Sequence, residues 1–264
     1  MRFAGAEVLT GARAAMARAL MPPRVGPTVL ATVEVPLARA AALAGGDDLL
    51  LHAMIVKATA NALTRHRLYT WAYNGAYRVF PTDRIDLRAP AGPGVDAAST
   101  VVRDADRKTL AQVADDLRAG AAAPVLAAAG DPVATLLDAH PFLLPLRWDL
   151  DALHALRMFA SRSYEERFWE RHREAVGSFY LSNVGPLGIK DFAAPVRLPS
   201  IVELGVCAPF ERTVVEKGAL ARRPFMHLVG RLDHRMTDVG QTARFLGDVR
   251  KNLEAPDTSL GPAT

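Results

Sequence analysis

Cysteine and lysine are both scarce in this chain of 264 residues. Cys207 is the only cysteine, which excludes an intrachain disulfide. Its place in the apolar run VELGVCAPF favours a small buried hydrophobe over a nucleophile. Only five of the 32 basic residues are lysine, and the arginines that make up the rest are scattered along the chain. A nucleic-acid-binding surface gathers its charge on one face, so the sequence does not favour a nucleic-acid partner.

Long apolar runs are missing as well. Hydrophobic residues make up 50% of the chain, enough for a sizeable core, yet no uninterrupted run approaches the length that spans a bilayer. Charged residues such as Glu7 and Arg18 interrupt the N-terminal segment, which excludes a compact signal core there. We therefore expect a soluble cytoplasmic protein without a membrane partner. The net charge of +4 weakly favours a phosphorylated ligand such as a coenzyme A nucleotide.

Signatures of several common enzyme classes are absent. There is no GxxxxGK[ST] phosphate loop, no GxGxxG turn that opens a helix after a strand, and no GxSxG turn around a nucleophilic serine. Five histidines are isolated, and none pairs with cysteine or carboxylates at a metal-binding spacing: His52, His66, His140, His154 and His172. We expect no metal, and no residue is assigned to cofactor binding.

The apolar pattern mixes strands and helices without strict alternation. Strands are predicted over 27–37, 99–104 and 177–183, with a strand pair in 196–210 and hairpins over 71–81 and 211–234. Helices are predicted over 48–66 with Asp48 as the cap, over 107–120 with Gly120 as the end, and over 237–254. The last helix has an apolar stripe of Val239, Ala243, Leu246, Val249 and Leu253. This order of elements predicts a single α/β sandwich-like domain over residues 1–264.

The segment 121–176 has a different character. It offers several apolar helical pieces that prolines interrupt, followed by a charged helix in which Phe168 and Trp169 form the apolar stripe. A charge run of this type usually marks a solvated helix face. We interpret the segment as a long helical insertion whose role the sequence leaves open.

His234 lies where the last predicted strand ends and the last helix begins, in GRLDHRMTDVGQ. A histidine there is held by a strand while its ring can reach a cleft, as general-base catalysis requires. Asp238, four residues later, could orient a neighbouring group. The alternative is structural: Thr237 or Asp238 caps the helix, and His234 is an ordinary strand-end residue. The short pattern alone favours this second interpretation.

Ser182 and Asn183 end the predicted strand in SFYLSNVGPLG. A serine hydroxyl at the end of a strand can donate a hydrogen bond to a developing oxyanion. The structural alternative is a strand that stops in an asparagine-containing turn, which is common in β proteins.

Taken together, these motifs resemble the catalytic domain of the dihydrolipoyl acyltransferases of 2-oxo acid dehydrogenase complexes. DHRMTDVG and the helix after it resemble the family's DHRxxDG signature, and SFYLSNVGPLG resembles its TFTISNLGxxG strand and turn. Three further segments match in order, namely GARAAMARAL, LHAMIVKATANAL and VVRDADRKTLAQVADDL. The resemblance implies an α/β fold like that of chloramphenicol acetyltransferase, a two-layer sandwich with helices packed on one side of a mixed sheet.

The resemblance also implies roles for particular residues. His234 would be the general base, Ser182 would stabilise the tetrahedral oxyanion, and Asp238 would be structural and pair with Arg13. Asn183 and Arg235, which adjoin the first two in their motifs, would support them. Family members are trimers with each active site between subunits, so we expect a homotrimer in which His234 and Ser182 come from different copies.

The implied activity is acyl transfer. An acyl group, most simply acetyl, would pass from a coenzyme A or carrier-protein thioester to a hydroxyl or thiol of a small-molecule acceptor. The chain begins close to the core motifs, so we expect no lipoyl group in cis and a free-standing enzyme, with specialised-metabolite biosynthesis as one setting. Val239 departs from the family glycine. The alternatives are a non-catalytic trimeric scaffold and the same fold repurposed for another reaction, such as a cyclisation.

Overall fold

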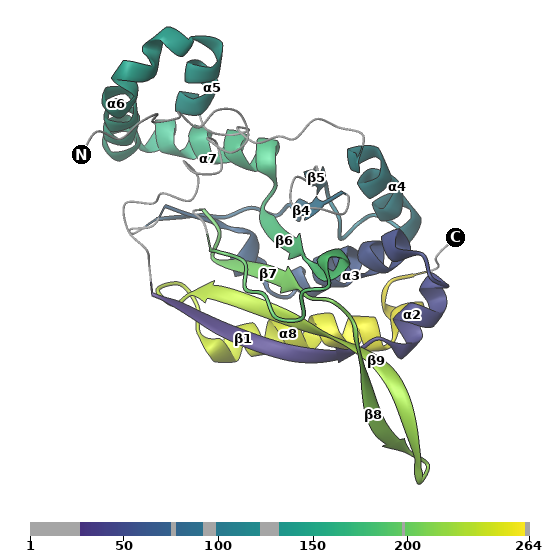
Figure 1. The fold of residues 1–264 in the computed structure, drawn as a ribbon. Coiled ribbons are helices and arrows are strands. Elements are labelled where there is room, and N and C mark those ends of the chain that lie inside the picture. Colours follow the sequence, from purple (N-terminus) through teal and green to yellow (C-terminus); the bar gives the residue numbers. More distant parts are fainter. Residues whose placement is uncertain (1–26, 75–77, 92–98, 122–131, 197–198, 262–264) are drawn as a thin grey trace, which may run out of the picture. The chain divides into compact units, whose positions relative to one another are not determined.

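The computed structural model describes residues 27–74, 78–91, 99–121, 132–196 and 199–261 (Figure 1). The chain divides into two compact units, the larger of 26–124 and 177–264 and the smaller of 1–25 and 125–176. The smaller unit contains nearly all of the predicted insertion, and its described elements are helical as predicted. That the whole chain forms one catalytic domain stays a prediction.

The larger unit is built on a mixed sheet of seven strands within the described residues. Its order is β1 (Thr28–Pro36), β9 (Ala219–Asp233), β7 (Val202–Val206), β6 (Phe179–Asn183), β4 (Leu87–Pro90) and β5 (Ser99–Val102). The remaining strand, β8 (Phe210–Glu216), pairs with the first part of β9 as a hairpin. β6 is parallel to both β4 and β7, whereas the other pairs are antiparallel.

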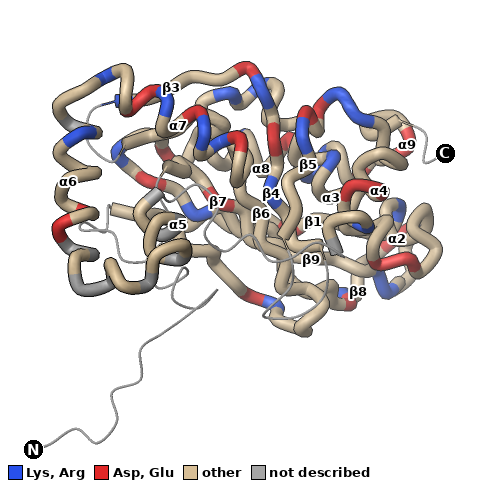
Figure 2. Tube along the Cα trace, turned by 90° about the horizontal axis from the view of Figure 1, so that it is seen from above, with Lys and Arg blue, Asp and Glu red and all other residues tan. Residues whose placement is uncertain are grey.

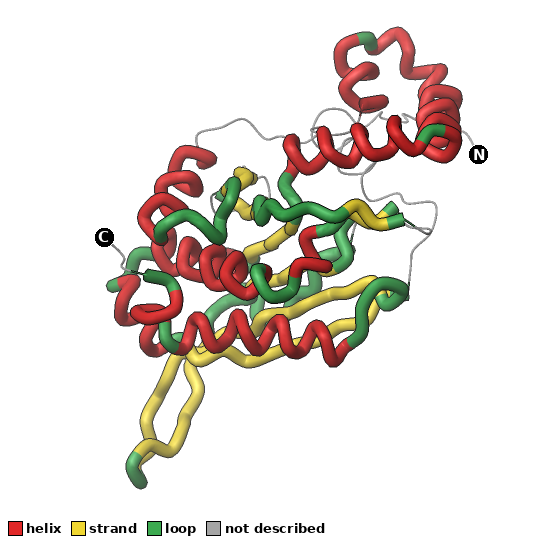
Figure 3. Tube along the Cα trace, turned by 180° about the vertical axis from the view of Figure 1, so that it is seen from behind, coloured by secondary structure: helices red, strands yellow, loops and turns green. Residues whose placement is uncertain are grey.

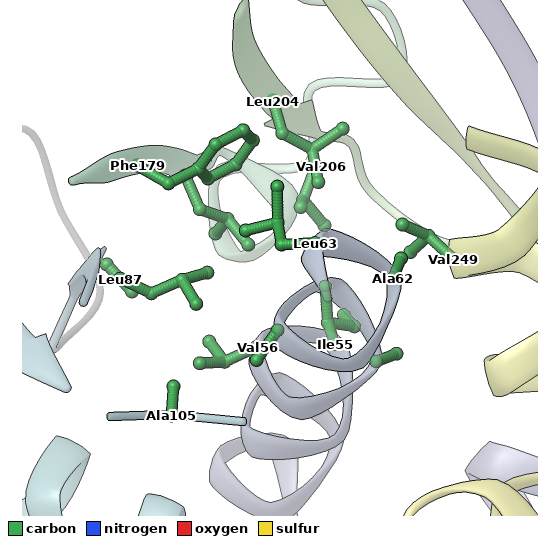
Figure 4. Close-up of a cluster of buried hydrophobic side chains, with 14 of the residues drawn as sticks. Ile55, Val56, Ala62, Leu63, Leu87, Ala105, Phe179, Leu204, Val206 and Val249 are labelled. Atoms are coloured by element: carbon green, nitrogen blue, oxygen red, sulfur yellow. The ribbon is translucent and has the colours of Figure 1, made fainter. Parts of the chain in front are cut away.

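Helices pack on one face of this sheet, as Figure 3 shows from behind. They are α2 (Ala38–Ala44), α3 (Asp48–Leu63), α4 (Leu110–Ala121) and α8 (Val239–Glu254). Alternate residues of the central strands point into the layer between sheet and helices, among them Phe179, Leu204 and Val206, which surround Leu63 of α3 (Figure 4). Burial of this apolar face is the main favourable contribution to folding. The predicted α/β fold with helices on one side of a mixed sheet is confirmed.

The smaller elements complete the larger unit. They are a 3₁₀ helix η1 (Arg67–Thr70), the paired β2 (Ala72–Tyr73) and β3 (Val79–Phe80), a second 3₁₀ helix η3 (Gly185–Leu187) and α9 (Pro256–Ser259). The two paired strands of the predicted hairpin over 71–81 are therefore confirmed. The predicted strand pair in 196–210 is wrong, since β7 alone lies between η3 and β8 in the part of the chain that the structure describes.

Two details of the helices differ from the sequence prediction. Asp47 rather than Asp48 caps α3, and its carboxylate accepts from the N–H groups of Leu49 and Leu50. In α8 the buried stripe contains Thr242, Phe245, Leu246, Val249 and Leu253, whereas Val239 and Ala243 are exposed. The predicted stripe was rotated because it passed over Phe245, the largest apolar side chain of the helix.

The smaller unit consists of α5 (Pro132–Ala139), a 3₁₀ helix η2 (Pro141–Leu146), α6 (Arg147–Ala160) and α7 (Arg162–Val176). His154 of α6 bonds through Nδ1 to the hydroxyl of Tyr164 at 3.1 Å, and its ring lies tilted against that of Phe168 with the centroids 4.9 Å apart. Basic and acidic residues alternate along α7 in Figure 2, with Arg162 and Glu166 in an i,i+4 ion pair. Trp169 is buried as the predicted apolar stripe requires. No helix among the described residues is long and apolar enough to cross a membrane.

Gly120 has a packing role in place of the predicted role as helix end. α4 continues through it to Ala121, and a Cβ at Gly120 would lie 2.3 Å from Cβ of Thr100 on β5. Only a residue without a side chain permits this close approach of α4 to the sheet. Gly247, in the middle of α8, has no heavy atom within 4 Å of the same position.

We expect opposite effects of alanine at these two helical glycines. Gly120→Ala lowers the free energy of unfolding by about 1–3 kcal/mol, because its methyl group overlaps Thr100. Gly247→Ala raises it by about 0.5–1 kcal/mol, because alanine favours the helix and meets open space. Urea denaturation followed by circular dichroism measures both. Equal stability of the two variants would contradict the assigned packing.

Candidate functional site

His234 occupies the turn between β9 and α8. Its N–H donates to the carbonyl of Pro27 at 2.8 Å, which ties the turn to the residue before β1. Its ring Nδ1 lies 3.1 Å from the carbonyl oxygen of Thr237. A carbonyl can only accept, so Nδ1 carries the proton and, in the neutral ring, Nε2 keeps its lone pair. The side chain is exposed, so Nε2 is available to take a proton from a substrate.

The carbonyl that orients His234 is itself held in place. Thr237 is only 6% exposed, and its hydroxyl bonds to the Tyr69 hydroxyl at 3.0 Å and to Oε1 of Gln241 at 2.8 Å. Tyr69 packs edge-on against Phe245 of α8, with ring centroids 5.3 Å apart. The orientation of the imidazole therefore depends on the core between η1 and α8.

The neighbours of His234 form an ion pair of their own. Asp233 is 3% exposed, and its carboxylate accepts from Nε of Arg235 at 2.9 Å. The guanidinium of Arg235 lies 5.2 Å from the ring centroid of Tyr73. Hydrogen bonding to Asp233 raises the pKa of Arg235. Arg235 thus has a structural partner, and Asp233, to which the sequence analysis gave no role, is the residue that anchors it.

Asp238 caps α8, as the structural interpretation of the motif predicted. Its carboxylate accepts from the N–H of Gln241 at 2.6 Å, and its backbone is extended, as an N-cap requires. Arg13 lies outside the described residues, so its pairing with Asp238 stays a prediction. Val239 is the first helical residue, 42% exposed and with a negative φ. Its replacement of the family glycine therefore causes no backbone strain.

Ser182 stands in β6 opposite Gly205 of β7. Leu181 points into the helix-covered core, so Ser182 lies on the other face of the sheet, where it is half-buried. A Cβ at Gly205 would lie 2.6 Å from the carbonyl oxygen of Phe192, so glycine lets the segment after η3 cover β7 beside the serine. Ser182 therefore lies beside the point where the segment around Phe192 packs on β7.

Asn183 connects this strand end to a histidine that sequence reasoning treated as isolated. Its Nδ2 donates to Nδ1 of His52 at 3.0 Å, and its Oδ1 accepts from the N–H of Gly185 at 2.9 Å. Nε2 of His52 lies 2.9 Å from the carbonyl oxygen of Pro90. No sequence spacing signals this contact, because 131 residues separate His52 from Asn183.

Two further features of the described residues bear on function: the reactivity of the Cys207 thiol and the placement of metal-binding side chains. Cys207 is buried, as predicted, and burial raises the pKa of its thiol, which disfavours a nucleophilic thiolate. No group of three or more His, Cys, Asp or Glu side chains is placed to hold a metal ion in the part of the chain that the structure describes.

The structure does not bring Ser182 and His234 together within one copy. Ser182, Gly205 and Val229 form one row across β6, β7 and β9. His234 lies five residues after Val229 along the chain. Because β9 runs antiparallel to β6 and β7, these five residues lead towards the N-terminal end of β6, whereas Ser182 is near its C-terminal end. At the usual rise per residue of a strand, Ser182 and His234 are about 16 Å apart along the strand direction. They are also separated across the strands, because β7 lies between β6 and β9. Ser182 therefore lies near the C-terminal end of β6 and His234 follows the C-terminal end of β9, and these two strands run in opposite directions in the sheet.

Comparisons with known proteins find similar sequences and similar folds. Residues 161–260 match the family model of the 2-oxoacid dehydrogenases acyltransferase (catalytic domain), a range that includes Ser182 and His234. A probable dihydrolipoyllysine-residue succinyltransferase component of the 2-oxoglutarate dehydrogenase complex from Schizosaccharomyces pombe is 38% identical over 86 residues. The acetyltransferase component of the pyruvate dehydrogenase complex from Rickettsia felis is 34% identical over 84 residues. These alignments cover 33% and 32% of this chain, and 19% and 20% of the relatives.

Solved structures extend the similarity of fold over nearly the whole chain. A probable dihydrolipoamide acetyltransferase from Listeria monocytogenes superposes with a TM-score of 0.64 over 99% of both chains, at 16% identity. The cubic core of a pyruvate dehydrogenase multienzyme complex gives a TM-score of 0.62, with 98% of this chain and 96% of that chain covered at 16% identity. The predicted resemblance is thus confirmed: residues 161–260 match the catalytic-domain model of the 2-oxoacid dehydrogenase acyltransferases, and the chain shares its fold with solved acyltransferase cores.

Proposed function

We propose that this protein is an acyltransferase that moves an acyl group from a coenzyme A thioester to a thiol or hydroxyl acceptor, with His234 as the general base. The observation that carries the proposal is the hydrogen bond from Nδ1 of His234 to the carbonyl of Thr237. It leaves Nε2 unprotonated in the neutral ring, at an exposed turn that the core holds in place.

The reaction follows from this tautomer. Nε2 of His234 removes the proton of the acceptor S–H or O–H, and the acceptor attacks the thioester carbonyl to form a tetrahedral oxyanion. When the intermediate collapses, the carbon–sulfur bond to coenzyme A breaks, and the leaving thiolate takes the proton back from Nε2. The acceptor is acylated and His234 returns to its initial state.

Ser182 would donate its hydroxyl hydrogen bond to the oxyanion. One donor of this kind contributes roughly 3 kcal/mol to lowering the barrier. Because Ser182 and His234 lie towards opposite ends of the sheet in one copy, a complete site needs Ser182 from one copy and His234 from another. We therefore propose a closed homotrimer with one site at each of its interfaces, the simplest ring consistent with the resemblance.

The acyl group and the acceptor are finer proposals. The relatives are named for acetyl and succinyl transfer to a dihydrolipoyllysine residue, so acetyl and succinyl thioesters and a dithiol acceptor come first. A small-molecule alcohol or thiol, as in specialised-metabolite biosynthesis, and an acyl carrier protein as thioester donor remain proposals. So does a cytoplasmic location. A thiol acceptor loses its proton more readily than an alcohol, which makes dihydrolipoamide the first acceptor to test.

Replacement of the base should abolish most of the activity. We expect His234→Ala to lower kcat roughly a hundredfold to ten-thousandfold, because no other group takes the acceptor proton. The measurement is release of free coenzyme A from acetyl- or succinyl-coenzyme A in the presence of dihydrolipoamide. His140→Ala is the matched control, since His140 is exposed and belongs to the smaller unit. Full activity of His234→Ala would exclude this mechanism. A wild type that neither binds coenzyme A nor turns over would favour the scaffold alternative, and a measured coenzyme A affinity would count against that alternative.

Two inactive variants should restore each other. Mixed trimers of His234→Ala and Ser182→Ala copies contain interfaces in which an intact histidine meets an intact serine. Random exchange at equal amounts restores roughly a quarter of the wild-type sites, because each site needs two particular copies. Activity is measured after joint refolding and compared with each variant refolded alone. If the mixture stays as inactive as its components, the two residues act within one copy or not in the same site.

A further inference from the structure

His52, Asn183 and the turn after Ser182 are connected by three consecutive hydrogen bonds. Pro90 of β4 accepts from Nε2 of His52, Nδ1 of His52 accepts from the amide of Asn183, and Oδ1 of Asn183 accepts from the N–H of Gly185. We propose that His52 is a positioning residue: it holds the Asn183 amide in one orientation and thereby fixes the turn that follows Ser182. The catalytic part of this inference depends on the proposed function, because only there does Ser182 act.

The donor and acceptor roles in this chain leave one arrangement. The carbonyl of Pro90 can only accept, so Nε2 of His52 must carry the proton. A neutral imidazole then presents Nδ1 as an acceptor, and the Asn183 amide must turn its NH₂ group towards it. The amide oxygen is left facing the N–H of Gly185. A flipped Asn183 amide would put oxygen against the Nδ1 lone pair and NH₂ against the Gly185 N–H, losing both bonds.

Burial keeps this arrangement in its neutral form. His52 is only 8% exposed within α3, and burial lowers its pKa. A protonated ring would carry a hydrogen on Nδ1 that faces the NH₂ group of Asn183. The neutral form is therefore the one that the surrounding groups accommodate.

These hydrogen bonds affect Ser182 because they hold the turn that directly follows it. Asn183 is the last residue of β6 and the neighbour of Ser182, and Gly185 opens η3. The N–H of Val184 donates to the carbonyl of Val206 at 2.9 Å, which ties the same turn to β7. Two fixed points, one from α3 and one from β7, therefore set the backbone on the C-terminal side of Ser182. An oxyanion donor must be held to within a fraction of an ångström to be effective.

Two substitutions separate the two bonds of His52. His52→Asn offers an oxygen near the place of Nδ1, so it can still accept from Asn183, but it loses the bond to Pro90. His52→Gln offers an amide near the place of Nε2, so it keeps the bond to Pro90 and loses the acceptor for Asn183. Each variant loses one buried hydrogen bond, so their stabilities should fall by similar amounts. Only His52→Gln releases the Asn183 amide.

The experiment measures kcat, KM and thermal stability of both variants, together with hydrogen exchange of the Gly185 amide by NMR on the full chain. We expect His52→Gln to lower kcat roughly tenfold to a hundredfold with little change in KM, and to lose protection at Gly185. His52→Asn should keep kcat and protection close to wild type despite its lower stability. His140→Gln serves as the control for a histidine outside this network.

The outcomes separate this inference from the proposed function. If kcat follows stability in both variants, or if Gly185 stays protected in His52→Gln, His52 is not a positioning residue. If the wild type transfers no acyl group but Gly185 loses protection only in His52→Gln, the positioning of the turn holds and the proposed function fails. The nitrogen chemical shifts of the His52 ring add an independent readout, and protonation on Nδ1 in place of Nε2 would overturn the inference.

Discussion

The proposed chemistry depends on one hydrogen bond, from the ring of His234 to the carbonyl of Thr237. Without it the imidazole could rotate and exchange tautomers, and a base at a solvent-exposed turn would have no defined direction. The bond is effective because Thr237 is buried and bonded to Tyr69, which packs against Phe245 in the core. An exposed side chain is thus positioned by buried residues of the core, as preorganised catalytic groups require.

The sheet imposes the second constraint. β6 and β9 run in opposite directions on either side of β7, so the residues that end them, Asn183 and Asp233, lie at opposite ends of the sheet. The site residues that adjoin them, Ser182 and His234, are therefore separated by topology. A mechanism that uses both residues needs a second copy, because the two motifs, about fifty residues apart, do not meet in one chain.

Sequence reasoning identified most of the fold and the residues around the candidate site. The end of β9 and the start of α8 were predicted because the strand pattern and the capping residue Asp238 are local sequence signals. His52 was missed because its partners Asn183 and Pro90 are distant in sequence, so only tertiary packing reveals them. The close approach at Gly120 was missed for the same reason, since a glycine near a helix end resembles a cap.

In the proposed site, His234 of one copy and Ser182 of another act on one thioester. A crystal structure of the assembled protein with bound coenzyme A tests it most directly. We expect the coenzyme A sulfur within hydrogen-bonding reach of Nε2 of His234, with Ser182 of a second copy facing the same point. A sulfur bound far from His234, or next to His234 with no second copy nearby, would contradict it.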